Sequence, residues 1–81
     1  METFIITFRS VTPAQRAEQL LRSMGINCNL GRTPRWMEEQ GCGYSLRTPN
    51  PEAIKLLHSH KIPFRKVYHQ GQKGGVEEVQ L

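Results

Sequence analysis

Cysteine is scarce in this chain of 81 residues, which contains only Cys28 and Cys42. Two cysteines cannot form the disulfide framework of a small secreted domain, and their spacing lacks the CxxC pattern of redox and zinc sites. The chain also lacks a long apolar run and an N-terminal signal segment, because Met1-Glu2-Thr3 leads directly into a strand-like pattern. We therefore expect a cytoplasmic protein with reduced thiols, no metal site and no membrane association.

Charge of one sign is not strongly in excess. Eleven Lys and Arg against seven Asp and Glu give a formal net charge of 11 − 7 = +4, far from the dense basic stripe of a dedicated nucleic-acid binder. RNA-binding sheets also carry aromatic side chains on their central strands. Here the third predicted strand offers Ser45 and Arg47 at those positions, so nucleic-acid binding ranks last among the functions considered.

The first half of the chain predicts a strand, a helix and a second strand. Residues 2–8 are β-branched and aromatic, which is typical of a strand. Thr12 followed by Pro13 predicts a helix start, and Gly25 predicts its end, so the helix is expected over residues 13–24. Asn27–Arg32 then predicts a second strand in which Cys28 and Leu30 are in phase, which favours a buried position for the Cys28 thiol.

The second half repeats the pattern. A loop over residues 33–41 leads into a third strand from Gly43 to Thr48, and Asn50-Pro51-Glu52 predicts a helix that runs to about His60. Residues 63–69 predict a fourth strand, and residues 70–75 a polar, glycine-rich linker. Residues 76–81 are expected to form either a frayed tail or a weak added strand.

This order, β-α-β-β-α-β, predicts an α+β fold of the ferredoxin-like plan: a four-stranded antiparallel sheet with two helices on one face. We expect one domain over residues 1–70 and a flexible tail over residues 71–81. Tyr44 and Leu46 suit the core, so Ser45 and Arg47 are expected on the open face of the sheet.

Cys42 carries the strongest functional signal, because it lies between Gly41 and Gly43 at the start of the third predicted strand. Paired glycines leave the sulfur accessible and expose backbone N–H groups beside it. A free cysteine has a pKa of about 8.5, and lowering it to about 7 requires about 2 kcal/mol of preferential stabilisation of the thiolate. Nearby guanidinium groups can supply this, with Arg35 the first candidate, Arg32 the second and Arg47 the weakest.

The segment Arg32-Thr33-Pro34-Arg35, followed by Cys42-Gly43-Tyr44-Ser45-Leu46-Arg47, resembles a family of small bacterial proteins described as selenium/sulfur carrier protein-like. The resemblance covers about residues 3–69, and it departs from the family at Gly41 and at Trp36-Met37. It implies a carrier that holds sulfur or selenium as a persulfide or selenosulfide on Cys42, without a cofactor. Its partners would be donor and acceptor proteins, and Arg32, Arg35, Gly41 and Gly43 would assist binding.

Other interpretations of the same residues stay open. Cys42 can be a small residue in a tight turn, and the loop arginines can be solvated or paired with Glu38 or Glu39. The protein can instead be a regulatory or small-molecule-binding module that acts as a homodimer. Catalytic turnover is undecided, because no histidine or acid has a spacing that identifies a base for Cys42. His58 and His60 are expected to be cations at the end of a helix, not metal ligands.

Overall fold

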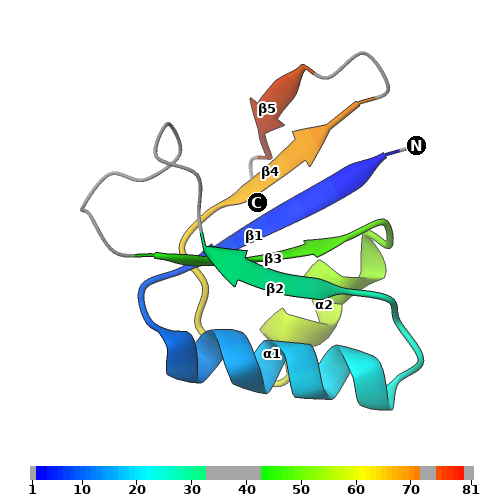
Figure 1. Ribbon diagram of the computed structural model, residues 1–81. Helices are drawn as coiled ribbons and strands as arrows, with labels where there is room; N and C mark the ends of the chain where they lie inside the picture. Colours follow the sequence, from blue (N-terminus) through cyan, green and yellow to red (C-terminus); the bar gives the residue numbers. More distant parts are fainter. Residues whose placement is uncertain (1, 33–42, 72–74, 80–81) are drawn as a thin grey trace.

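A computed structural model describes residues 2–32, 43–71 and 75–79. The elements in chain order are β1 (Thr3–Phe8), α1 (Val11–Ser23), β2 (Asn29–Arg32), β3 (Tyr44–Thr48), α2 (Glu52–Ser59), β4 (Val67–Gln70) and β5 (Val76–Glu78). The two helices lie together on one face of a single sheet (Figure 1). The predicted α+β class, with two helices and an antiparallel sheet, is confirmed.

The sheet has the strand order β2-β3-β1-β4-β5, and all neighbouring strands are antiparallel. Because β1 and β2 are both antiparallel to β3, they run in the same direction with β3 between them. The end of β1, the end of β2, the start of β3 and the start of β4 therefore lie at one end of the sheet (Figure 1).

The prediction of four strands is wrong, because β5 adds a fifth strand at the edge. Tyr68 of β4 pairs with Glu78, and Gln70 pairs with Val76. The N–H of Val79 donates to the carbonyl of Val67 at 2.7 Å, which extends the pairing. Of the two alternatives for this segment, the structure has the added strand. Its sequence pattern is weak because the stretch is short and carries two glutamates.

The hydrophobic core lies between the sheet and the two helices. It is formed by buried side chains from every helix and from strands on the helical side: Ile6, Phe8, Ala14, Ala17, Leu21, Cys28, Leu46, Ala53, Leu57 and Val67. The expected burial of Cys28 is confirmed, with 6% of its surface exposed. None of the described helices is long and apolar enough to cross a membrane.

The opposite face of the sheet is less open than predicted. Strand alternation places Ser45 and Arg47 on this face, since Leu46 belongs to the helical core. Arg47 is exposed there as expected, but Ser45 is only 1% exposed. Ile5 and Thr7, which share this face, are also buried. Ser45 therefore lies on the predicted face of the sheet but is buried there, so this face is not open at Ser45.

The two helices end in the same way. At the end of α1, Gly25 has φ 77°, and the N–H groups of Gly25 and Ile26 donate to the carbonyls of Arg22 and Leu21. At the end of α2, Lys61 has φ 56°, and the same pair of bonds joins Lys61 to His58 and Ile62 to Leu57. Both are Schellman motifs, whose left-handed residue is usually glycine.

The helix starts differ from each other. Asn50 caps α2 as predicted, because its Oδ1 accepts a hydrogen bond from the Glu52 N–H at 2.9 Å. The start of α1 was predicted wrongly: the helix begins at Val11, and Ser10 occupies the N-cap position without a side-chain capping bond.

A local irregularity precedes β4. The Arg65 N–H donates to the Thr7 carbonyl at 2.7 Å, and the Thr7 N–H donates to the Lys66 carbonyl at 2.9 Å. The Lys66 N–H donates to Thr7 Oγ1 at 3.0 Å. Arg65 and Lys66 therefore both lie opposite Thr7, as the two residues of a β-bulge lie opposite one residue of the partner strand. This arrangement explains why the fourth strand begins at Val67 and not at the predicted Pro63, which also lacks an N–H to donate.

Candidate functional site

The predicted site lies where the chain enters β3. Gly43 is half-buried and precedes Tyr44, which pairs with Phe8 of β1 on one side and with Arg32 of β2 on the other. Of the predicted site residues, Cys42, Arg35 and Gly41 lie outside the described part of the chain. Arg32, which is exposed, is therefore the predicted arginine whose proximity to the start of β3 can be assessed.

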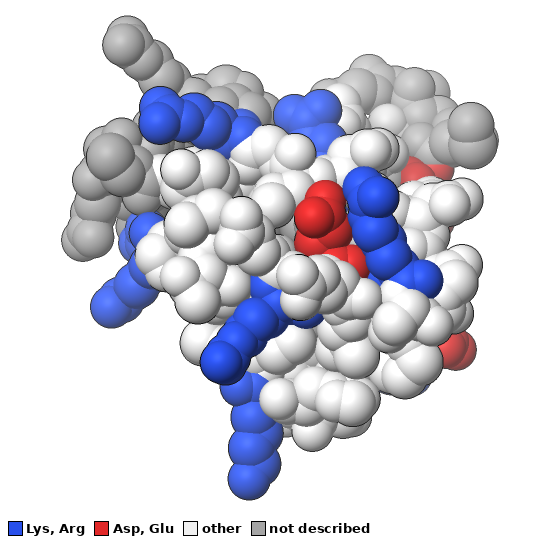
Figure 2. All heavy atoms as spheres, turned by 60° about the horizontal axis from the view of Figure 1, so that its bottom comes forward, with Lys and Arg blue, Asp and Glu red and all other residues white. Residues whose placement is uncertain are grey.

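Further basic residues gather at this end of the sheet. Arg9 follows β1 directly, while Arg65 and Lys66 belong to the bulge that precedes β4. Arg16 lies in the second turn of α1, which starts at the same end. Figure 2 views the helical face: the coloured side chains on its left side, toward this end, are blue, whereas blue and red side chains occur together at the centre and right. We call this end, with Arg9, Arg16, Arg32, Arg65 and Lys66, the basic end.

Among the described residues, Glu78 reduces the charge of the basic end. Lys66 Nζ lies 3.6 Å from Glu78 Oε1, with both side chains partly exposed. An exposed pair of this kind contributes little to stability, but it neutralises part of the local charge. Arg9, Arg16 and Arg32 still make this end of the sheet electropositive. A positive potential stabilises an anion, and the reactive form of a cysteine is the thiolate anion.

Arg47 lies at the other end of the ladder between β2 and β3. It pairs with Asn29, whereas Arg32 pairs with Tyr44. Three residues of strand separate the two pairs, which corresponds to about 10 Å. Arg32 therefore lies nearer to the start of β3 than Arg47 does.

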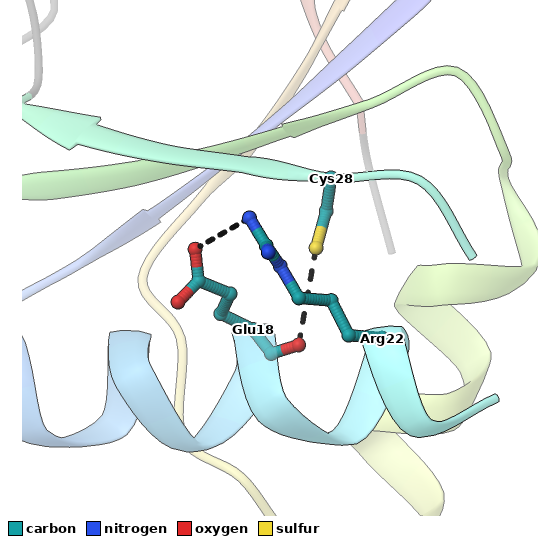
Figure 3. Close-up of polar contacts among 3 residues, drawn as sticks. All are labelled: Glu18, Arg22 and Cys28. Atoms are coloured by element: carbon teal, nitrogen blue, oxygen red, sulfur yellow. Dashed lines mark hydrogen bonds and ion pairs between the residues drawn. The ribbon is translucent and has the colours of Figure 1, made fainter. Parts of the chain in front are cut away.

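Cys28 lies toward this other end and has the environment of a structural thiol. It is buried against α1, and its Sγ lies 3.9 Å from the Glu18 carbonyl oxygen, to which the S–H donates (Figure 3). The Glu18 carboxylate instead pairs with Arg22 at 3.3 Å (Figure 3). A thiol that is buried in this way is poorly placed to react, because a reagent cannot easily reach its sulfur.

Cys28 is also remote from the start of β3. Its neighbour Asn29 pairs with Arg47, which is four residues along β3 from Gly43, or about 13 Å. The Cα atoms of a disulfide normally lie within about 7 Å of each other. The two ends of this ladder therefore carry different chemistry: a buried thiol at one end and a cluster of cations at the other.

The sequence did not reveal Arg9, Arg16, Arg65 and Lys66 as members of the site. These residues are separated by up to 57 positions from one another, and only the placement of β1 between β3 and β4 brings them to one end. One feature of the sequence could have identified some of them: Arg9, Arg32 and Lys66 each lie at or next to the end of a strand, on the side of the sheet where β3 begins.

Comparison with known proteins gives one match. No curated protein and no solved structure matches the chain significantly. A protein family does match, over residues 3–69, which spans β1 to β4 and includes both Arg32 and Cys42. Because the match covers most of the chain, the protein belongs to the family described as "Putative Se/S carrier protein-like".

Proposed function

We propose that this protein carries sulfur or selenium as a persulfide or selenosulfide on Cys42 and passes the atom to a partner protein. The observation that supports this most directly is the basic end of the sheet, from which the chain leads through Gly43 into β3. Family membership supports the same role in its general form. We further propose that β1 to β4 and the two helices form a ferredoxin-like scaffold for the site.

The transfer step is an exchange between sulfur atoms. The Cys42 thiolate attacks the outer sulfur of a donor persulfide, the donor's S–S bond breaks, and the donor leaves as a thiolate. The new S–S bond lies on Cys42, so no external oxidant or reductant is consumed. A selenium atom would be taken up in the same way, through attack on a donor selenosulfide and formation of an S–Se bond.

The basic end favours each anionic species in this step. The attacking thiolate, the departing thiolate and the ionised persulfide all carry negative charge, and cations within a few ångströms stabilise them. Arg32 pairs with Tyr44 directly beside Gly43, so it is the described arginine that we assign to this role. Arg35 and the N–H groups of Gly41 and Gly43 complete the proposed site.

Release requires a thiol from outside the chain. Cys28, the other cysteine, is buried and lies at the far end of the ladder. We therefore propose that an acceptor protein attacks the loaded atom, and that donor and acceptor dock at the basic end. This role suits acidic surfaces on both partners.

Mass spectrometry of the loaded protein tests the proposal. After incubation with a small-molecule persulfide donor and removal of excess reagent, the wild-type chain is expected to gain the mass of one sulfur atom. Cys42→Ser should gain none, whereas Cys28→Ser should gain the same mass as the wild type. An adduct that persists in Cys42→Ser and disappears in Cys28→Ser would overturn the assignment.

A further inference from the structure

A hollow of about 340 Å³ lies where the β1–α1 connection meets the segment that leads into β4. The yellow segment before β4 passes beside the start of α1 in Figure 1. The described residues that line the hollow come from both segments: Arg9, Ser10, Thr12, Pro13, Arg16, Pro63, Phe64 and Arg65. Its volume is near the lower end of the range for small-molecule sites in proteins.

Three arginines line this hollow, and no acidic residue is among its described lining residues. Each arginine is placed by a different element: Arg9 by the end of β1, Arg16 by the second turn of α1, and Arg65 by the bulge at Thr7. An anion bound between the like charges of Arg9 and Arg16 would be stabilised by both. The hollow is therefore a concave surface that Arg9 and Arg16 make electropositive.

The start of α1 adds to this potential. The Ser10 hydroxyl makes no capping bond, and the first turn of this 13-residue helix contains no acidic side chain. Unpaired N–H groups and the positive end of the helix dipole consequently remain uncompensated by the described residues of that turn. The hydroxyls of Ser10 and Thr12, both on exposed residues lining the hollow, provide further polar groups.

The rest of the lining is apolar. Pro13, Pro63 and Phe64 contribute ring surfaces to the same hollow, and Phe64 also packs against the hydrophobic core, which holds it in place. An inorganic anion would contact the arginines but leave these rings uncovered. A ligand that covers both parts needs an anionic group and a flat or apolar body.

We propose that this hollow binds the phosphate ester of a small aromatic or apolar molecule, with the phosphate between Arg9 and Arg16 and the body against Phe64. A phosphate monoester carries a charge of about −1.5 to −2 at neutral pH, which matches several guanidinium groups better than a single carboxylate does. This binding goes beyond the carrier role and does not depend on the chemistry of Cys42.

Titration with phenyl phosphate, followed by two-dimensional NMR of the ¹⁵N-labelled chain, tests the proposal. Saturable shifts are expected for amides of residues 9–16 and 63–65, and inorganic phosphate should bind less tightly because it leaves Phe64 uncovered. Arg16→Ala should weaken phenyl phosphate binding at least about fivefold. Arg22→Ala is the matched control, since it removes an exposed arginine of the same helix outside the hollow and should leave affinity nearly unchanged.

The proposal would be overturned if no saturable shift appeared up to about 10 mM phenyl phosphate, since weak specific sites bind in the millimolar range. It would also be overturned if Arg16→Ala and Arg22→Ala weakened the affinity for phenyl phosphate equally. A third contradicting result is an equal affinity for inorganic phosphate and phenyl phosphate. The circular dichroism spectrum of each variant shows whether it is folded, and Arg9→Ala provides a second variant should Arg16→Ala fail to fold. Repeating the titration on Cys42→Ser separates this site from the carrier chemistry, because binding should persist there whether or not Cys42 carries sulfur.

Discussion

Arg32 and Arg47 form a natural pair of probes, because both are exposed arginines on the ladder between β2 and β3. Arg32 lies opposite Tyr44, one residue from Gly43, whereas Arg47 lies opposite Asn29 about 10 Å further along. Each carries one positive charge in a similar solvent environment. Their contributions to the potential at the start of β3 therefore differ through distance and through the face of the sheet on which each side chain lies.

Arg32→Ala should raise the pH midpoint of Cys42 alkylation by about 0.3 pH unit at low salt, because it removes a cation that stabilises the thiolate. Arg47→Ala should raise it by less, because its charge lies about 10 Å further along the ladder and the Coulomb interaction weakens with distance. The rate of iodoacetamide labelling at a series of pH values, measured in a Cys28→Ser background, gives both midpoints. Equal midpoints for the two variants would contradict the assignment of Arg32 to the site.

At the scale of elements, the ends of the two helices show one motif built with two different residues. Gly25 adopts its left-handed conformation without strain, and a Cβ built at this position meets nothing within 4 Å. Lys61 adopts the corresponding conformation at the end of α2 with a full side chain, which costs about 1–2 kcal/mol relative to an unstrained residue. The second helix is therefore terminated less favourably than the first.

Reciprocal substitutions should change the free energy of unfolding in opposite directions. Gly25→Ala is expected to lower it by about 1 kcal/mol, because alanine is strained at positive φ. Lys61→Gly is expected to raise it by about 0.5 kcal/mol, since relief of strain exceeds the added entropy of glycine in the unfolded chain. Urea denaturation monitored by circular dichroism measures both changes.

Gly31→Ala serves as the control for this pair. Gly31 lies in β2 without a positive φ, and an added Cβ meets nothing within 4 Å. Its free energy of unfolding should stay the same or rise slightly, because alanine has less freedom in the unfolded chain. A loss of about 1 kcal/mol in this variant as well would show that backbone conformation at Gly25 is not the cause.

At the scale of the whole molecule, the sequence predicted features that depend on local chemistry. The strand at residues 2–8, the cap formed by Asn50 and the helix end at Gly25 depend on residue type at one or two positions. The bulge before β4 could not be predicted, because the Lys66 N–H is satisfied by Thr7, 59 positions away. Burial of Ser45 likewise depends on what covers the sheet, and alternation within β3 specifies only the face.

Part of the candidate site could likewise be predicted from the sequence, and part depends on the tertiary structure. The glycines beside Cys42 and the arginine at the end of β2 were visible as neighbours in the sequence. The contributions of Arg9, Arg16 and Arg65 arise from tertiary structure, since β1 and β4 are adjacent only in the folded sheet. Sequence patterns could therefore suggest a reactive thiol, but the electropositive hollow required the strand order.

The three-residue strand β5 has a consequence for self-association. It lies beyond the residues that define the family and covers one side of β4, whose N–H and C=O groups would otherwise face solvent. Glu77 and Glu78 are exposed on this outer strand, and charged residues on a short edge strand discourage pairing with another chain. We therefore expect β5 to prevent the edges of two sheets from pairing and aggregating.

A chain shortened to residues 1–71 should therefore associate with itself through β4. Analytical ultracentrifugation is expected to show larger species that increase with concentration, whereas the full chain should show fewer of them at the same concentrations. Purely monomeric behaviour of the shortened chain, with its helix content intact, would contradict this role. If the shortened chain does self-associate, the role of β5 is to keep the protein soluble at high concentration, and it takes no part in the proposed carrier chemistry.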